Sequence, residues 1–301
     1  MKIHILQTGS SKLKRSFING KVKSIFRKLN IIFDKHLDAD CPYFNYLIEH
    51  PEGLILIDTG ESVHSLKREY YTFLSWNFIK NVSKISIKRE DEIDYQLKKI
   101  GYAPEDVKKV IITHLHQDHI GGLKYFPNAE IFVSKKDYLS AYKMGASISG
   151  YIRKMWPKNF APKLIEFLKD KYLPFNESYF FTEAKDVIIV PTYGHSSGNI
   201  SVILKDKQKN FLFCGDSTFR EELFLKEKVD GVCSDYKKSK DSINKMQEFC
   251  KINPTILLPS HDPGAKNRLI KKKTVYSNLK NQWGDLTAIQ HCNYSLYSLR
   301  N

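Results

Sequence analysis

The sequence predicts an α/β fold, because short apolar runs typical of strands alternate with stretches of helical periodicity in both halves of the chain. The chain has 301 residues, of which 42% are hydrophobic and 27% are charged. This composition is that of an ordinary globular protein and argues against a largely disordered chain. The length allows one large domain or two medium ones, each with a substantial core.

The elements of the first half follow from local patterns. The turn Pro51-Glu52-Gly53 separates two apolar runs, which indicates a hairpin. Ile93, Leu97 and Ile100 share one face of a helix that Gly101 ends. In chain order we expect strands at 1–6, 46–48 and 54–57, a helix at 90–100, strands at 110–112 and 130–133, and a helix at 136–144.

Two segments rich in aromatic residues, 65–86 and 145–175, break this alternation. We expect both to be insertions, and we interpret 145–175 as inserted helices that cover a site, with ordinary core packing as the alternative. The chain is thus predicted to be a single domain, 1–301, with cap segments near 65–86 and 145–175. The remaining expected elements are strands at 187–190, 200–204, 211–213 and 255–258, and a helix at 240–250.

Several function classes are disfavoured by composition. No apolar run approaches the ~18–20 residues of a membrane helix, and the N-terminus lacks the apolar stretch of a signal peptide. The five cysteines are widely spaced without a C-x-x-C pair, which argues against a disulfide framework or a cysteine zinc site. We therefore expect a cytoplasmic protein without a transmembrane segment.

The formal net charge is +15, from 48 basic and 33 acidic residues. Basic residues gather in two runs, 11–30 and 263–301, with seven in each. Such runs are most often a solvated face, but nucleic acid, an anionic membrane, an acidic substrate or a second copy of the chain in a homodimer would also suit them. Composition alone does not choose among these partners.

The strongest chemical signal is the run His114-Leu115-His116-Gln117-Asp118-His119. Residues two apart at the end of a strand leave the same face, so His114 and His116 can reach one point. Asp118 and His119 follow where the chain turns and can face a second point nearby. Imidazole and carboxylate ligands suit a borderline divalent ion such as zinc.

Three further candidates also follow expected strands: His195, Asp216 and His261. Taken alone, each would more often be a core or loop residue than a ligand. Together with the histidine-rich run they give five histidines and two aspartates. That number suffices for two metal ions that share one bridging ligand.

At this point the sequence resembles the metallo-β-lactamase superfamily, through the H-x-H-x-D-H run, the three later strand-end residues and the turn Asp58-Thr59-Gly60. It looks most like the N-acyl-homoserine lactonase branch. The features that support this are the strand pair 45–60, the segment 101–106 and the spacings between successive candidate ligands. These spacings are 76 residues from His119 to His195, 21 from His195 to Asp216 and 45 from Asp216 to His261.

The resemblance implies a four-layer αββα sandwich with helical insertions and a site for two metal ions, expected to be Zn²⁺, at one edge. It implies that Asp58 orients a ligand histidine. It also implies two ligand groups joined by a bridge, namely His114, His116 and His195 for one ion, Asp118, His119 and His261 for the other, and Asp216 between them.

The implied reaction is the hydrolysis of a lactone, of the N-acyl-homoserine type used in quorum sensing, or of another small ester. A hydroxide bridging the two ions attacks the carbonyl carbon, and Asp118 passes a proton to the leaving oxygen. Asp118 and Asp216 are accordingly the expected catalytic carboxylates. The substrate is expected to be a small molecule, since the covering segment 145–175 is apolar and aromatic.

One position departs from that branch, whose members commonly carry a tyrosine three residues after the bridging aspartate. Here that position is Phe219, which cannot donate a hydrogen bond to a substrate carbonyl. Tyr193 is a candidate substitute, although packing at a strand end is the interpretation we favour for it.

Other readings remain open from the sequence. The basic runs suit a phosphodiesterase or ribonuclease of the same superfamily, and the motif is shared with thioesterases of the glyoxalase II kind. Flavodiiron enzymes usually carry glutamate at the second position of the motif, where this chain has His116. A site that binds metal only structurally is the least favoured, because all seven ligands are present.

Overall fold

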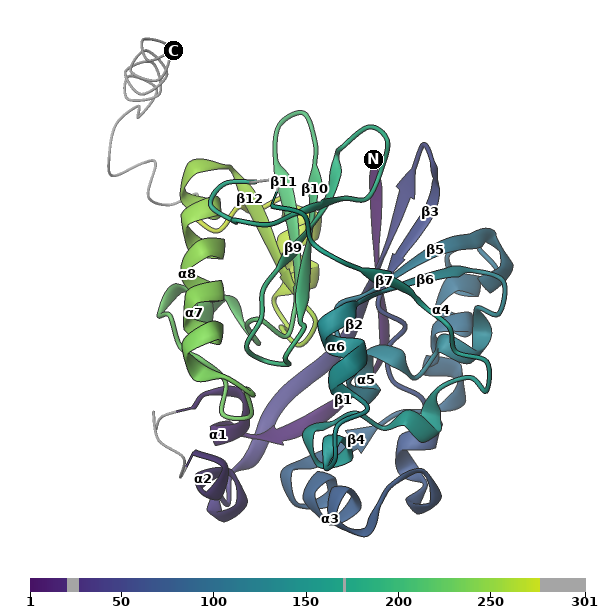
Figure 1. The fold of residues 1–301 in the computed structure, drawn as a ribbon, viewed down its shortest axis with the longest axis vertical. Helices are drawn as coiled ribbons and strands as arrows, with labels where there is room; N and C mark the ends of the chain where they lie inside the picture. Colours follow the sequence, from purple (N-terminus) through teal and green to yellow (C-terminus); the bar gives the residue numbers. More distant parts are fainter. Residues whose placement is uncertain (21–26, 170–171, 277–301) are drawn as a thin grey trace.

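The computed structural model describes residues 1–20, 27–169 and 172–276 (Figure 1), and these form two β-sheets with helices on their outer sides. The first sheet has seven strands in the order β4-β1-β2-β3-β5-β6-β7, and the second has five in the order β12-β11-β10-β9-β8. The strands are β1 (Lys2–Lys14), β2 (Leu37–His50), β3 (Gly53–Ile57), β4 (Ser83–Ser86), β5 (Val107–Ile112), β6 (Glu130–Ser134), β7 (Lys163–Ile165), β8 (Tyr179–Phe180), β9 (Val187–Pro191), β10 (Ile200–Lys205), β11 (Asn210–Gly215) and β12 (Thr255–Pro259).

Helices lie on both outer sides of the pair of sheets. In Figure 1, α7 and α8 lie outside the sheet of β9 to β12, and α4 lies beside β5 and β6. The α-helices are α1 (Arg15–Ile18), α2 (Arg27–Phe33), α3 (Phe73–Val82), α4 (Ile93–Lys99), α5 (Gln117–Ile120), α6 (Lys135–Ser140), α7 (Glu221–Leu225), α8 (Tyr236–Ile252) and α9 (Ala265–Lys271). Short 3₁₀ turns occupy Val63–Leu66, Arg68–Tyr70, Arg89–Asp91, Pro104–Asp106, Leu123–Tyr125, Ala146–Ser149 and Arg153–Met155.

The layers follow from the two-residue period of buried strands. In β5, Ile111 joins the cluster between the two sheets, whereas Val110 and Ile112 on either side of it join the cluster under α4. In β11, Phe213 faces the cluster between the sheets and Leu212 packs toward α8. Because these central strands bury both faces, both sheets need a helical cover, and the expected αββα sandwich is confirmed.

The order of parallel strands brings functional segments to one edge. Strands β3, β5 and β6 are mutually parallel, and so are β11 and β12. The segments after their carboxyl ends carry Asp58, His114, Asp137, Asp216 and His261. Side chains that follow such strand ends meet in the crevice beyond the sheet, as in other α/β folds.

The hairpin expected around Pro51-Glu52-Gly53 is confirmed by the antiparallel pairing of β2 with β3. The helix expected at 240–250 is α8, which is longer at both ends. It begins earlier because Asp235 caps it by accepting a bond from the backbone N–H of Lys238. The helix expected at 90–100 is divided into a 3₁₀ turn and α4. Gly101 follows it with a φ of 88°, as expected for a helix end.

The interpretation of 145–175 as inserted helices is wrong. Its described residues, which exclude 170–171, contain two 3₁₀ turns and the strand β7, which pairs in parallel with β6. Gly145 and Gly150 adopt φ values of 77° and 95°, and Pro157 and Pro162 lack the N–H that a helix needs. The helix expected at 136–144 likewise ends at Ser140.

The segment expected as a second insertion, 65–86, contains α3 and then β4, which adds a strand at the edge of the first sheet. The described residues of the N-terminal basic run are largely regular structure, since residues 11–14 belong to β1 and Arg27 begins α2. Lys21 and Lys23 of that run, and Lys280, Arg300 and Cys292 near the C-terminus, lie outside the described residues. No helix in the described part of the chain is long and apolar enough to cross a membrane.

We predict that Phe213→Ala destabilises the fold by about 3–5 kcal/mol, because it empties space between two sheets that do not collapse freely. The side chain of Phe213 is fully buried, whereas that of Phe33 on α2 is 75% exposed. Urea unfolding should therefore show Phe33→Ala within about 0.5 kcal/mol of the wild type. Equal effects of the two substitutions would contradict the assigned core.

Candidate metal centre

Three histidines meet beyond β5 and β9 and form the first group of metal-binding atoms. His114 and His116 follow β5, and His195 follows β9 in a loop that contains Gly194 at a φ of 132°. The Nε2 atom of His195 lies 3.1 Å from the Nδ1 atom of His116, and the rings of His114 and His116 are 4.4 Å apart between centroids. One nitrogen from each lies within 4.8 Å of the others, a spacing that fits one ion.

Asp118, His119 and His261 form the second group. Asp118 and His119 lie on α5, which follows β5 along the chain, and His261 follows β12. The Nε2 atom of His261 lies 3.4 Å from a carboxylate oxygen of Asp118, and the Nε2 atom of His119 lies 3.9 Å from the other. Their ligand atoms also lie within 4.8 Å of one another.

Asp216 lies between the two groups. Its Oδ1 atom is 3.3 Å from the Nε2 atom of His119 and 3.0 Å from that of His261. Its Oδ2 atom is 3.4 Å from the Nε2 atom of His195 in the other group. Gly215 allows this approach, because a Cβ there would lie 2.7 Å from the hydroxyl oxygen of Thr113.

The ring nitrogens that face away from this centre have partners of their own. The Nδ1 atom of His119 lies 2.8 Å from a carboxylate oxygen of Asp58, the contact expected from the sequence. The other outward contacts, each of which fixes a ring orientation, are from His261 to the carbonyl oxygen of Pro42 at 2.9 Å, from His114 to the Thr113 hydroxyl at 3.2 Å and from His195 to Asp230 at 3.4 Å.

The residues fit a pair of divalent ions. Three inward atoms, Nε2 of His114, Nε2 of His119 and Oδ1 of Asp216, are buried and have no hydrogen-bond partner among the described residues. Unpaired buried polar atoms are costly, so several at one point indicate that another group satisfies them. A donor set of imidazoles and carboxylates suits zinc or a similar ion.

The electrostatics of the centre favour cation binding. Burial, reinforced by neighbouring histidines, holds the pKa values of His114 and His116 well below the usual value, so both rings keep a free lone pair at neutral pH. Burial opposes ionisation of Asp216, but His261 and His119 outweigh it and hold the pKa of that carboxyl well below its usual range. Burial opposes protonation of His119, His195 and His261 as well, but Asp216 raises the pKa of His119 and His261, and Asp230 raises that of His195. The centre therefore presents two neutral imidazoles, a carboxylate and three imidazoles whose protons a bound cation would displace.

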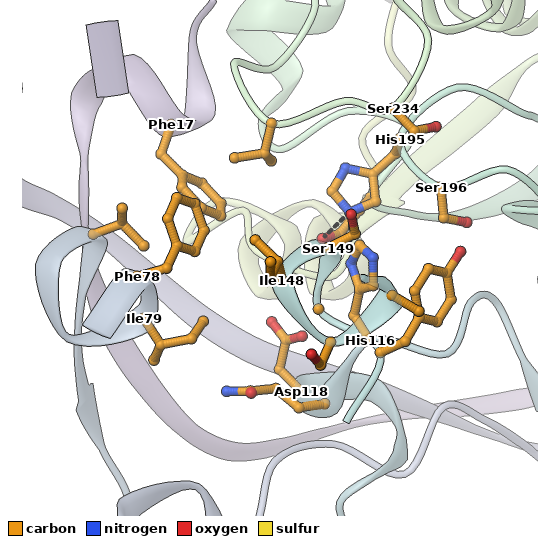
Figure 2. Close-up of a pocket in the computed structure, with 18 of the residues that line it drawn as sticks. Phe17, Phe78, Ile79, His116, Asp118, Ile148, Ser149, His195, Ser196 and Ser234 are labelled. Carbon is orange, nitrogen blue, oxygen red and sulfur yellow. Dashed lines mark hydrogen bonds and ion pairs between the residues drawn. The ribbon is translucent and has the colours of Figure 1, made fainter. Parts of the chain in front are cut away.

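A cavity of about 320 Å³ opens onto this centre. Figure 2 shows His116 and His195 on one side of the cavity and Phe17, Phe78 and Ile79 on the other, with Asp118 and Ile148 between them and Ser149 beside the two histidines. The apolar end is built by α1 and α3 beside the long strand β1. A pocket with a polar centre at one end and apolar walls at the other suits a small amphiphilic molecule.

The two candidate substrate contacts have different surroundings. Phe219 lines the cavity and stacks on the ring of His261, with centroids 5.1 Å apart and planes inclined by 24°. Tyr193 is not among the residues that line the cavity; its ring packs against Phe167 and lies 4.1 Å from the Lys136 ammonium. Tyr193 is thus placed as a packing residue, the reading favoured from the sequence.

Three buried carboxyl groups beside the centre were not singled out from the sequence: Glu61, Asp137 and Asp230. Burial and the nearby charge of Asp118 raise the pKa of Glu61 to about 8, and its carboxylate accepts a bond from the side-chain amide of Gln117. Asp137 lies on the short helix α6, and Glu61 and Asp230 lie in irregular segments. Their contacts with Gln117, Ser196 and His195 join residues that are distant in sequence, so no local pattern marks these contacts.

Comparison with known proteins agrees with this geometry. Residues 39–261 match the family model of the metallo-beta-lactamase superfamily. An N-acyl homoserine lactonase from a Bacillus species is 30% identical over 230 residues, covering 74% of this chain and 82% of that protein. The N-acyl homoserine lactonase of Bacillus cereus is 28% identical over 271 residues, covering 87% and 93%.

Solved structures agree with the same family. An N-acyl homoserine lactone hydrolase with the product N-hexanoyl-L-homoserine bound at its catalytic metal centre superposes with a TM-score of 0.71 at 25% identity. The match covers 88% of this chain and 95% of that one, so it extends over both sheets.

We predict that Asp58→Asn weakens the binding of one zinc ion by roughly 10–100-fold, because the neutral amide no longer orients and polarises His119 as a carboxylate does. Competition with a chelating dye measures this affinity directly. Asp34→Asn is the matched control, since that carboxylate also accepts backbone N–H bonds and contacts a histidine ring but lies outside the centre. Unchanged zinc affinity in Asp58→Asn would contradict the role of Asp58.

Proposed function

Because the chain belongs to the metallo-β-lactamase superfamily, we propose that it is a dinuclear metal-dependent hydrolase that opens the ring of an N-acyl homoserine lactone or a similar small lactone. The observation that carries this proposal is the pair of ligand groups that meet at Asp216, at one end of a cavity whose other end is apolar. Such an activity would remove the lactone signals used in quorum sensing.

We assign His114, His116 and His195 to one ion and Asp118, His119 and His261 to the other, with Asp216 in contact with both groups. When bound, two such ions, which we expect to be zinc, would supply an activated water and polarise the carbonyl oxygen. No serine or cysteine nucleophile is needed in this scheme. The chain's own contribution is to hold the ligands rigidly and to shape the cavity.

Asp118 is the residue we assign to proton transfer. Both Asp118 and Asp216 line the cavity, but the side chain of Asp118 is 23% exposed, whereas that of Asp216 is only 4% exposed. A carboxylate at the cavity wall can hold a proton on its free oxygen beside the leaving ring oxygen of a lactone. Asp216 is enclosed by histidines, so its task is to orient them and to balance the charge of the ions.

The apolar end of the cavity favours an acyl chain. Its walls include Phe17 on α1 and Phe78 and Ile79 on α3, opposite the metal-binding side chains (Figure 2). A solved relative holds an N-hexanoyl product at its metal centre. Among the described residues that line the cavity, Lys143 is the only lysine or arginine, which suits a neutral ligand better than a polyanionic nucleic acid.

Phe219 shapes the carbonyl end of the cavity without donating a hydrogen bond. Its ring stacks on His261 and also lies 5.8 Å from the ring of His195. It therefore forms an apolar wall across both ligand groups. Orientation of the substrate amide or carbonyl is left to hydroxyl groups of the cavity, of which that of Ser149 lies on the metal side in Figure 2.

We predict that the zinc-loaded protein hydrolyses N-hexanoyl-homoserine lactone and that a chelator abolishes the activity until zinc is restored. Asp216→Ala should lower kcat/KM by at least about 100-fold, since the buried histidines lose their shared counter-charge. Ring opening releases one proton at neutral pH, so titration at constant pH follows it. Full activity of the metal-free protein or of Asp216→Ala would refute the assignment.

We predict that Phe78→Ala raises KM for a long-chain lactone by roughly tenfold and leaves KM for a butanoyl lactone nearly unchanged, because only the long chain reaches the apolar end. Phe73→Ala on the same helix is the matched control, since that ring is 69% exposed and does not line the cavity. Equal changes for short and long chains would show that the acyl chain lies elsewhere.

A further inference from the structure

Asp137 is a buried carboxylate that joins three separate segments around the first ligand group. It lies on α6, directly after β6, and its side chain is fully buried. It accepts hydrogen bonds from the backbone N–H of Leu115 at 2.7 Å, the hydroxyl of Ser196 at 2.6 Å, the hydroxyl of Tyr151 at 2.8 Å and the backbone N–H of Gly198 at 3.1 Å.

Each of these donors lies close to a histidine of the first group, either along the chain or in space. Leu115 lies between His114 and His116 in the sequence. Ser196 directly follows His195, and Gly198 is two residues further along the same loop. One carboxylate therefore ties the loop after β5 to the loop after β9, although the two loops belong to different sheets.

Tyr151 extends this connection to the covering segment. Its ring lies edge-on to that of His116, with centroids 5.2 Å apart, while its hydroxyl donates to Asp137. The neighbouring Gly150 approaches His116 so closely that a Cβ there would lie 2.8 Å from a ring carbon. The covering segment thus packs against the ring of His116 beside the cavity.

The contact between the loop after β9 and helix α6 is tightly packed. A Cβ on Gly198 would lie 2.2 Å from the backbone nitrogen of Asp137, so this loop packs directly on α6. Four donors on one buried carboxylate also fix the positions of the groups that carry them, because moving any of them leaves a buried charge underbonded.

The second ligand group is held by other residues. His119 contacts Asp58, and His261 contacts the carbonyl oxygen of Pro42. The backbone of His119 is itself fixed, since its carbonyl oxygen accepts a bond from the N–H of Thr59. None of these four hydrogen bonds of Asp137 reaches this group.

We propose that Asp137 is a positioning residue that sets the geometry of His116 and His195 for one of the two ions and leaves the other ion largely unaffected. This inference rests on the proposed dinuclear function. Asp137 touches neither ion nor substrate, and it acts through the backbone of the loops that carry the ligands. Its removal should therefore change the two ions unequally, which a general loss of stability would not do.

The test measures metal release from the full-length, zinc-loaded protein in excess chelator, with thermal unfolding recorded in parallel. The wild type should release two ions in two phases. His195→Ala and His261→Ala each remove a ligand of one group, and so identify which phase belongs to which ion. A wild type that binds fewer than two ions would overturn the proposed dinuclear centre itself, and with it this inference.

In Asp137→Asn we expect the phase of the first ion to accelerate by about 10–100-fold, while that of the second changes by less than about threefold. Ser196→Ala, which removes one donor and keeps the carboxylate, should accelerate the same phase to a smaller extent. This second variant also tests the proposal if Asp137→Asn does not fold. Equal acceleration of both phases, or no acceleration of the first phase in either variant, would overturn it.

Glu92→Gln is the matched control for a buried carboxylate. Glu92 is fully buried, accepts bonds from the backbone N–H of Val63 and the hydroxyl of Tyr125, and pairs with Lys124, but it contacts no ligand loop. It should lower the unfolding temperature and leave both release phases within about threefold of the wild type. If Glu92→Gln released the first ion as fast as Asp137→Asn, selective positioning by Asp137 would be refuted.

Discussion

The contact of one buried carboxylate with histidines from both sheets is the interaction on which the rest of this structure depends. Asp216 follows β11 in the second sheet, yet its oxygens lie beside His119, which follows β5 in the first. Five of the seven ligand side chains, all except His116 and Asp118, are buried at this junction, which is favourable only when they share charge with each other and with bound cations. The strands that precede the ligands must therefore end close together at one edge of the two sheets, and the loops that carry the ligands must be rigid.

The surrounding shell meets this requirement with fixed contacts. The outward ring nitrogen of His119 contacts a carboxylate, and that of His261 contacts a carbonyl oxygen. Asp137 links the two loops of the first ligand group. The N-terminal region contributes as well. Arg27, from the basic run, donates to the carbonyl oxygens of Gly231 and Cys233, next to the Asp230 that contacts His195. At least this part of the excess positive charge serves the structure of the centre.

Much of the fold could be predicted from the sequence, because apolar periodicity and turn residues are local signals. The hairpin at Pro51-Glu52-Gly53, the strand before His114 and the helix α8 were all marked in this way. The segment 145–175 was misjudged, since its aromatic residues suggested helices while its glycines and prolines prevented them. The strand β7 within it pairs with β6, and a pairing partner is not encoded in local pattern.

The sequence by itself determined the chemistry of the centre: which residue types follow which strands, and hence the imidazoles and carboxylates that can bind two cations. Only the tertiary structure decided how they are held. Asp137 and Asp230 join loops that are distant along the chain, and Phe78 faces the cavity because α3 packs across its far end. Ligand identity depends on residue chemistry, which is written in the chain, whereas orientation and cavity shape depend on long-range packing, which appears only when both sheets are in place.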